Sequence, residues 1–217
     1  LRNEKKYIFK KNLNFHHIEQ LNSSFGFNCS NLFIPTSKEE ENKVNHDLDS
    51  SYKHIVIFPG GNWAPKLWPT ENFNIIMKSL LENYSKVKFI LVGSLKEKNK
   101  FYNELIKGIK KELIIDLFGY NLTLTSAYMK KSNFFIGNDS GLMHLAVANK
   151  LQVISLFGPT DDKVYGPFGD NDIVIRTSES LQYFKSLKID ENKSYMNSIK
   201  PEIVFQKCVK IINENIN

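Results

Sequence analysis

The stretch FFIGNDSGLMHLAVAN, residues 134–149, places small and polar residues between an apolar run and an amphipathic one. Asp139 or Ser140 can cap a helix by accepting hydrogen bonds from the free N–H groups of its first turn. Alternatively, a helix N-terminus beside Gly141 offers unpaired N–H donors and a positive dipole end to an anion, typically a phosphate. His144 lies four residues after Ser140 and faces the same way on such a helix, which favours a polar ligand contact over burial. The stretch therefore predicts a capped turn or a phosphate site.

Two further charged residues are candidates for the same ligand. Lys66 lies in NWAPKLWP, where tryptophan and proline neighbours are stiff. It is either a solvated lysine or a point charge aimed at phosphate. Glu97 follows the apolar run VKFILVG, where it either pairs with a lysine at the surface or accepts hydrogen bonds from ribose hydroxyls.

These residues require a parallel sheet to bring them together. From His54 onward, apolar runs at 54–58, 87–93, 113–119, 134–139 and 152–160, with a sixth at 172–177, alternate with helical patterns. Strands that are apolar throughout predict a Rossmann-like α/β fold with helices on both faces of a parallel sheet. Ligands of such sheets bind beyond the carboxyl ends of the strands. Four groups of residues are expected there: Gly60-Gly61-Asn62, Gly93-Ser94 with Glu97, Asn138 to Gly141, and Gly158-Pro159-Thr160.

The helical patterns lie at 70–84, 95–111, 124–132 and 141–149. A closing helix is expected to start at Pro201 and to turn one apolar face inward, made of Ile203, Val204, Lys207, Cys208 and Ile211.

Residues 1–50 differ in pattern from the rest. They contain one short helical pattern near 15–26 and a polar run at 36–51, and the chain starts at Leu1. We interpret 1–50 as a linker and the end of a truncated N-terminal domain, and 51–217 as one nucleotide-sugar-binding domain with a C-terminal helix.

Composition narrows the class of ligand. The net charge of the 217 residues is +6, but only Arg2 and Arg176 are arginines, and lysines alternate with acids. Because base readout relies on arginine, a small anionic ligand is favoured over nucleic acid. No apolar run is long enough for a bilayer and no signal peptide precedes the fold, which predicts a cytoplasmic protein without a transmembrane segment. Cys29 and Cys208 lack metal-ligand spacing and are expected to be reduced thiols. The sequence contains no cluster of carboxylates, so no magnesium site is predicted.

Several motifs resemble those of one known family. The segments FPGGNWAPKLWP, GSLKE, IGNDSGLMHLAVA, LFGPTDDKVYGPFG and SIKPEIVFQK are similar to successive motifs of glycosyltransferase family 9, the ADP-heptose:lipopolysaccharide heptosyltransferases. The resemblance implies a two-domain GT-B enzyme of which this chain is the donor-binding half. It implies that Lys66 contacts the diphosphate and that Glu97 contacts the ribose. The diphosphate and the sugar are both expected to contact a third set of residues: Asp139, Ser140, Gly141 and His144. Gly60, Gly61 and Asn62 complete the expected donor site.

The resemblance also implies an activity, which is the inverting transfer of heptose from ADP-heptose to the lipopolysaccharide inner core at the inner membrane face. The ADP-sugar is then a substrate and no cofactor or metal is expected. Lys66 would stabilise the leaving group, and the catalytic base would come from the N-terminal domain. The alternatives are another nucleotide sugar as donor, or a noncatalytic module that binds nucleotide or nucleic acid.

Overall fold

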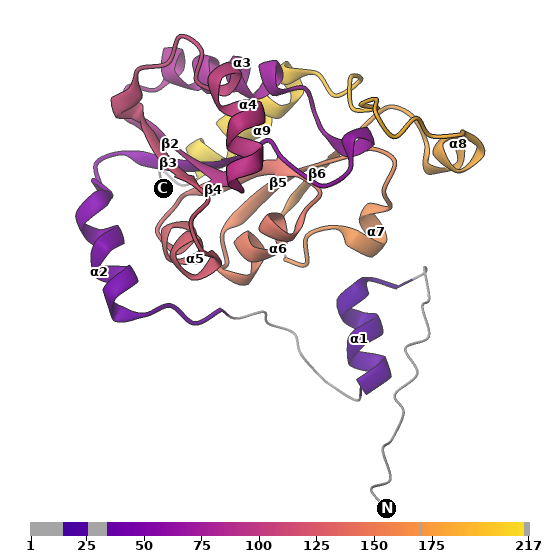
Figure 1. The fold of residues 1–217 in the computed structure, drawn as a ribbon, viewed down its shortest axis with the longest axis horizontal. Coiled ribbons are helices and arrows are strands. Elements are labelled where there is room, and N and C mark those ends of the chain that lie inside the picture. Colours follow the sequence, from indigo (N-terminus) through magenta and orange to yellow (C-terminus); the bar gives the residue numbers. More distant parts are fainter. Residues whose placement is uncertain (1–14, 26–33, 170, 215–217) are drawn as a thin grey trace, which may run out of the picture.

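A six-stranded parallel sheet forms the centre of the protein (Figure 1). The computed structural model describes residues 15–25, 34–169 and 171–214. The strands are β1 (Lys53–Phe58), β2 (Val87–Gly93), β3 (Ile114–Phe118), β4 (Phe134–Asn138), β5 (Gln152–Phe157) and β6 (Ile173–Arg176). Every neighbouring pair is parallel, and the order is β3-β2-β1-β4-β5-β6. The predicted Rossmann-like sheet, including its sixth strand, is confirmed.

Strand order reverses between β1 and β4, which are neighbours although two strands separate them in the chain. Val56 at the centre of β1 pairs with Ile90 of β2 on one side and with Phe135 of β4 on the other. All three are fully buried, because helices cover both faces of the sheet. In open α/β sheets such a reversal leaves a crevice at the carboxyl ends of the strands, where ligands bind.

Figure 1 shows helices on both faces of the sheet. One face is covered by α3 (Thr70–Asn83), α4 (Leu95–Leu105) and α9 (Pro201–Glu214), and the other by α2 (Lys38–Asp47), α5 (Leu122–Lys130) and α6 (Gly141–Ala148). The shorter elements are α1 (His17–Phe25), α7 (Asp162–Tyr165), α8 (Leu181–Ser186) and the 3-10 turns η1 (Ala64–Lys66) and η2 (Lys111–Leu113). The helices α7 and α8 were not predicted, because each is at most six residues long.

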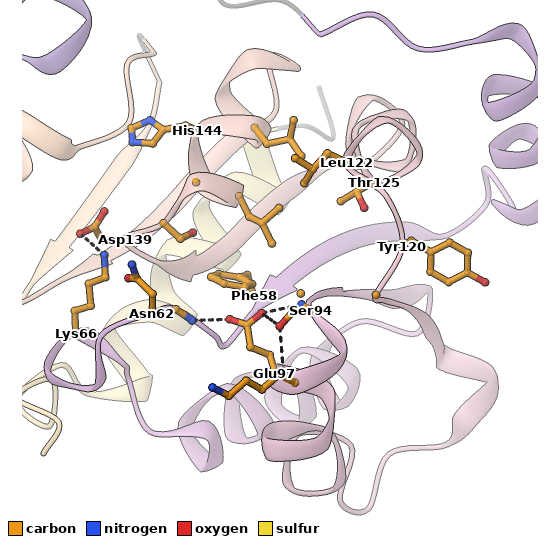
Figure 2. A pocket seen from close by; sticks show the side chains of 18 of the residues that line it. Phe58, Asn62, Lys66, Ser94, Glu97, Tyr120, Leu122, Thr125, Asp139 and His144 are labelled. Atoms are coloured by element: carbon orange, nitrogen blue, oxygen red, sulfur yellow. Dashed lines mark hydrogen bonds and ion pairs between the residues drawn. The ribbon is translucent and has the colours of Figure 1, made fainter. Parts of the chain in front are cut away.

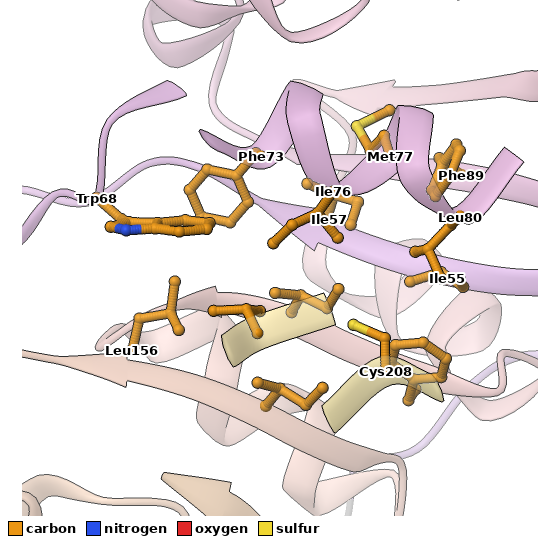
Figure 3. Close-up of a cluster of buried hydrophobic side chains, with 14 of the residues drawn as sticks. Ile55, Ile57, Trp68, Phe73, Ile76, Met77, Leu80, Phe89, Leu156 and Cys208 are labelled. Atoms are coloured by element: carbon orange, nitrogen blue, oxygen red, sulfur yellow. The ribbon is translucent and has the colours of Figure 1, made fainter. Parts of the chain in front are cut away.

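The core under α3 and α9 fixes the end of the chain segment that leads from β1 into α3 (Figure 3). Trp68 packs edge-on against Phe73 at 4.9 Å between ring centroids, and its indole N–H donates to the Ile199 carbonyl. Cys208 of α9 is a free, buried thiol whose pKa is raised by burial. Trp68 therefore holds the end of the loop that carries Lys66 against the core.

The predicted inward face of α9 is partly wrong. Val204, Cys208 and Ile211 are buried as expected, but Ile203 and Lys207 are exposed. Buried residues at spacings of four and three follow the 3.6-residue period of one helix face, and Ile203 lies about 100° away from that face.

The polar run at 36–51 is not an irregular linker, since most of it forms α2. Ser37 accepts a hydrogen bond from the Glu40 backbone N–H, and the Glu40 carboxylate accepts from the Ser37 N–H, which is a complete capping box. Val44 is fully buried, and the Tyr128 hydroxyl of α5 donates to Asp47. The helix therefore packs on the fold.

Two other outcomes of the sequence predictions concern a helix boundary and the described part of the chain. The helix predicted for 95–111 ends at Leu105, and Gly108 then adopts φ 76°, which breaks the helix. Arg2 and Cys29 lie outside the described residues.

Candidate functional site

The loops that follow β1 to β5 line a single pocket of about 1390 Å³ at the carboxyl edge of the sheet (Figure 2). Eight of the nine predicted site residues contribute to its lining: Gly61, Asn62, Lys66, Glu97, Asp139, Ser140, Gly141 and His144. The sheet topology therefore gathers residues that are up to 83 positions apart, from Gly61 to His144, into one cavity. Gly60 is the exception.

Gly60 lies behind the pocket wall. Its carbonyl accepts a hydrogen bond from the Asn138 amide, and a Cβ on Gly60 would lie 2.1 Å from the Glu97 carboxylate. A glycine is needed here for close packing between two loops. The next residue, Gly61, has φ 148° and does line the pocket, as does the exposed Asn62.

The turn from β4 into α6 combines the two roles that its sequence left open. Ser140 is the N-cap of α6, and its hydroxyl accepts from the Met143 N–H at 3.3 Å. Gly141 is the first helical residue, and a Cβ built on it would have no protein atom within 4 Å. The fold itself therefore does not require glycine at 141, and the space beside this helix N-terminus is part of the pocket.

Asn138, the residue before this turn, is structural. It is fully buried, its amide group donates to the carbonyls of Pro59 and Gly60 at 2.8 and 3.1 Å, and its carbonyl accepts from the Trp68 N–H at 3.1 Å. One side chain thus joins the end of β4 to the loop after β1 and to the start of α3.

Lys66 and Asp139 form an ion pair in the pocket wall. Lys66 Nζ lies 3.1 Å from Asp139 Oδ2, and the two side chains are only 13% and 8% exposed. An ammonium has three donors, so the pairing leaves two N–H groups of Lys66 for a ligand oxyanion. Lys66 is thus a fixed charge at the pocket, held by a partner as well as by its stiff neighbours (Figure 2).

His144 lines the pocket one turn into α6. Its pKa is lowered chiefly by burial. The nearby Asp139 carboxylate raises the pKa, whereas His16, His17 and Lys66 lower it further. In the free chain the imidazole is therefore neutral at pH 7.

Glu97 has a structural task that the sequence analysis did not foresee. It is the third residue of a capping box at the start of α4, and its Oε2 accepts from the Ser94 N–H and hydroxyl at 2.7 and 2.8 Å. Its Oε1 accepts from the Gly61 N–H at 2.8 Å. The carboxylate thus ties two loops of the pocket together, and Oε1, which accepts one hydrogen bond, still has a lone pair that can accept from a ligand hydroxyl.

One end of the pocket, beside β3, is apolar and was not predicted. Tyr120 and Leu122 are 52% and 62% exposed, and Leu95 is equally exposed beside them. Large apolar side chains that remain open to a cavity favour a flat apolar ligand group. The available signal was the sequence GYNL after the third strand, at the same edge as the polar clusters.

The opposite end lies beside β5 and includes Thr160 and Tyr165. Arg176, the last residue of β6, donates to the carbonyls of Gly158 and Thr160 at 2.6 and 2.9 Å and to the Asp162 carboxylate at 2.6 Å. The guanidinium thereby fixes the loop from β5 to α7.

The described part of the chain contains no group of three or more His, Cys, Asp or Glu side chains arranged to hold a metal ion. Among the same residues, no helix combines the length and the apolar character that a membrane span requires.

The fold and the pocket together define a class of protein. A 3-2-1-4-5-6 parallel sheet with a pocket at its switch point and a helix N-terminus facing that pocket is a Rossmann-like α/β fold, in which that position is where nucleotides bind in proteins of this class.

Comparison with known proteins gives the family. The profile of glycosyltransferase family 9 (heptosyltransferase) matches residues 15–195, and the chain belongs to this family. Lipopolysaccharide heptosyltransferase 3 of Escherichia coli (strain K12) is 27% identical over 80% of this chain and 51% of its own length. Lipooligosaccharide heptosyltransferase 2 of Haemophilus influenzae is 28% identical over 73% of this chain and 47% of its own length.

Solved structures agree with the fold. The family 9 glycosyltransferase from Veillonella parvula superposes with a TM-score of 0.72 at 26% identity, over 91% of this chain and 58% of that one. E. coli ADP-heptose LPS heptosyltransferase II gives a TM-score of 0.69 at 22% identity, over 85% of this chain and 54% of that one. The chain spans about half the length of the curated relatives it matches.

Proposed function

We propose that this chain is the donor-binding part of a heptosyltransferase that transfers heptose from ADP-heptose to the inner core of lipopolysaccharide. The observation that carries the proposal is one continuous pocket with an apolar end at β3 and the positive end of a helix dipole at the β1/β4 switch point. Family membership and the names of the relatives support the choice of heptose.

The pocket suits a nucleotide diphosphate lying along the strand ends. The adenine packs against Tyr120 and Leu122, and Glu97 accepts from the ribose. The diphosphate then lies at the N-terminus of α6, where Gly141 leaves room for it and Lys66 donates to its oxygens. Asp139 and His144 reach the distal phosphate and the sugar.

The proposed reaction is an inverting displacement without metal. The acceptor hydroxyl oxygen attacks the anomeric carbon, the bond from that carbon to the diphosphate oxygen breaks, and a base takes the acceptor proton while ADP departs. Negative charge grows on the leaving diphosphate, and Lys66 with the α6 N-terminus stabilises it as preorganised charge. We propose that the base and the acceptor contacts come from residues outside this chain.

The proposal also sets location and partners. The acceptor is a lipopolysaccharide core at the cytoplasmic face of the inner membrane, so the protein works in the cytoplasm or peripherally at that membrane. Nucleic acid is not a partner, and the nucleotide sugar is a substrate rather than a cofactor.

Calorimetric titration of the chain with ADP-heptose, UDP-sugars, GDP-sugars and duplex DNA tests the proposal. We expect binding of ADP and ADP-heptose, with much weaker binding of the other nucleotides. Preference for a UDP- or GDP-sugar would assign another donor. DNA binding that falls steeply with salt, without affinity for any nucleotide sugar, would replace the proposal with a nucleic-acid module.

Transfer is tested separately with heptose-deficient lipopolysaccharide core as acceptor. We expect the 217-residue chain to bind donor but to transfer poorly, because positioning donor and acceptor together contributes roughly 7–11 kcal/mol to lowering a barrier. A longer protein that includes the native upstream sequence should transfer efficiently. Failure of the longer protein to transfer, with donor bound, would contradict the proposed activity.

A further inference from the structure

The loops that line the pocket follow one another in the order of the strands in the sheet, and this order indicates which part of the ligand lies at each end of the pocket. Its lining starts at the loop after β3, passes the loops after β2, β1 and β4, and ends at the loop after β5. Neighbouring strands lie about 4.8 Å apart, so four spacings cover about 19 Å. With the base at β3 and the diphosphate at the switch point, the sugar of a nucleotide sugar reaches the β5 end.

The β5 end offers a hydroxyl that the fold leaves unused. Thr160 lines the pocket, and its Oγ1 is buried without a hydrogen-bond partner among the residues that the structure describes. A buried hydroxyl without a partner is costly and calls for an explanation. A change of the Thr160 χ1 angle to another staggered rotamer moves Oγ1 to a different position around Cβ and turns the hydroxyl toward the cavity.

The surroundings of Thr160 favour a neutral polyol over a second phosphate. Arg176 directs its guanidinium to the carbonyls of Gly158 and Thr160 and to the Asp162 carboxylate, so its charge is already compensated. Asp161 is the next residue after Thr160 and caps α7 with its carboxylate. The Asp161 carboxylate beside the β5 end repels an anion, whereas a threonine hydroxyl both donates to and accepts from sugar hydroxyls.

The loop that carries Thr160 is fixed in place. Two hydrogen bonds from one planar guanidinium hold the carbonyls on both sides of Pro159, and a lysine cannot reproduce this fork geometry. The position of the Thr160 backbone is therefore set by Arg176.

We propose that Thr160 recognises the sugar of the donor by hydrogen bonding to one of its hydroxyls, with Arg176 as the positioning residue that holds Thr160 at the pocket. This inference rests on the proposed function, because it requires a nucleotide sugar in the pocket. It adds a specificity determinant that distinguishes the sugar nucleotide from the nucleotide alone.

The test compares ADP with ADP-heptose on four variants of the chain. Thr160→Val keeps the shape of the side chain and removes the hydroxyl, and Thr160→Ser restores a hydroxyl. Thr177→Val is the matched control, because it removes another buried threonine hydroxyl, one that does not line the pocket. Thr160→Val should not lower the unfolding midpoint, since no protein hydrogen bond is lost.

We expect Thr160→Val to weaken ADP-heptose binding about tenfold, which corresponds to about 1.4 kcal/mol, while ADP binding changes less than twofold. Thr160→Ser should recover most of the affinity, and Thr177→Val should change neither ligand. Arg176→Lys should also reduce the preference for ADP-heptose over ADP. Equal loss for both ligands, or no loss for either, would overturn the inference while leaving the donor site intact. A wild-type chain that binds neither ligand would overturn the proposed function and this inference with it.

Discussion

The ion pair between Lys66 and Asp139 predicts that removal of Lys66 destabilises the fold, whereas the sequence alone predicts no effect on stability. A lysine held only by stiff neighbours should be removable without effect on folding, so that the unfolding midpoint barely moves. The structure instead places its ammonium 3.1 Å from a carboxylate, with both side chains nearly buried. Replacing Lys66 by Met keeps the volume of the side chain and leaves Asp139 as an unpaired, buried charge.

The size of the effect follows from distance and burial. At an effective dielectric constant of about 20, two unit charges 3.1 Å apart attract by about 5 kcal/mol. Desolvation of both groups offsets much of this, but removal of one partner exposes the full penalty of the other. We expect Lys66→Met to lower the free energy of unfolding by about 3 kcal/mol, and Asp139→Asn to lower it by a similar amount. The double variant should lose clearly less than the sum, with a coupling of about 2 kcal/mol.

Urea titration followed by circular dichroism measures these values, with Lys96→Met as the matched control. Lys96 also lines the pocket but is exposed, so its loss should cost less than about 0.5 kcal/mol. Strictly additive single variants, or a Lys66→Met protein as stable as the control, would refute the reasoning. ADP affinity measured on the folded Lys66→Met protein then reports on ligand binding separately from stability.

Three further predictions concern other parts of the site and the sheet. Asn138→Ala should lower the free energy of unfolding by about 3 kcal/mol in urea titration, because it leaves two buried carbonyls and one N–H without their bonds. Gly141→Ala should raise stability by up to about 0.5 kcal/mol through lower backbone entropy in the unfolded chain, yet weaken ADP binding at least tenfold, since its methyl group would occupy the space at the α6 N-terminus; unchanged ADP affinity would argue against a phosphate there. The pKa of His54 is lowered by burial and by Lys88, so below about pH 6.5 the unfolded chain binds a proton that the folded chain does not, and the free energy of unfolding falls as the pH falls. His54→Leu should remove up to about 1.4 kcal/mol of that loss per pH unit between pH 7.5 and 5.5, measured by urea titration at each pH.

The sheet was predictable because its signals are local. Apolar runs bounded by glycine and proline mark each strand, and helical patterns between them require parallel pairing. The helix α2 was missed although its capping box, Ser37 with Glu40, is written in the sequence. One buried residue, Val44, in an otherwise polar segment gives too weak a periodicity to indicate the side that packs.

The site was predictable as a collection of residues but not as a set of contacts. The rule that ligands bind at the carboxyl ends of parallel strands gathers Lys66, Glu97 and Asp139 at one edge. It does not reveal that Lys66 pairs with Asp139, or that Glu97 caps α4 and holds Gly61. The contacts of Lys66 with Asp139 and of Glu97 with Gly61 depend on side-chain directions across loops more than thirty residues apart, which no spacing in the sequence encodes. The capping box of Ser94 and Glu97 is a local pattern that the sequence does contain.

The packing of α2 on α5 has a consequence for how the chain becomes ordered during synthesis. The Tyr128 hydroxyl meets Asp47 across 81 residues, and the Thr123 hydroxyl meets Glu40 across 83. A ribosome adding roughly 5–20 residues per second needs several seconds to cover that interval, during which α2 has no partner from α5. The same α5 carries Leu122 and Thr125 into the apolar end of the pocket. The part of the cavity beside β3 therefore forms only after β1 to β3 and α5 have emerged, and the proposed nucleotide site is incomplete until then.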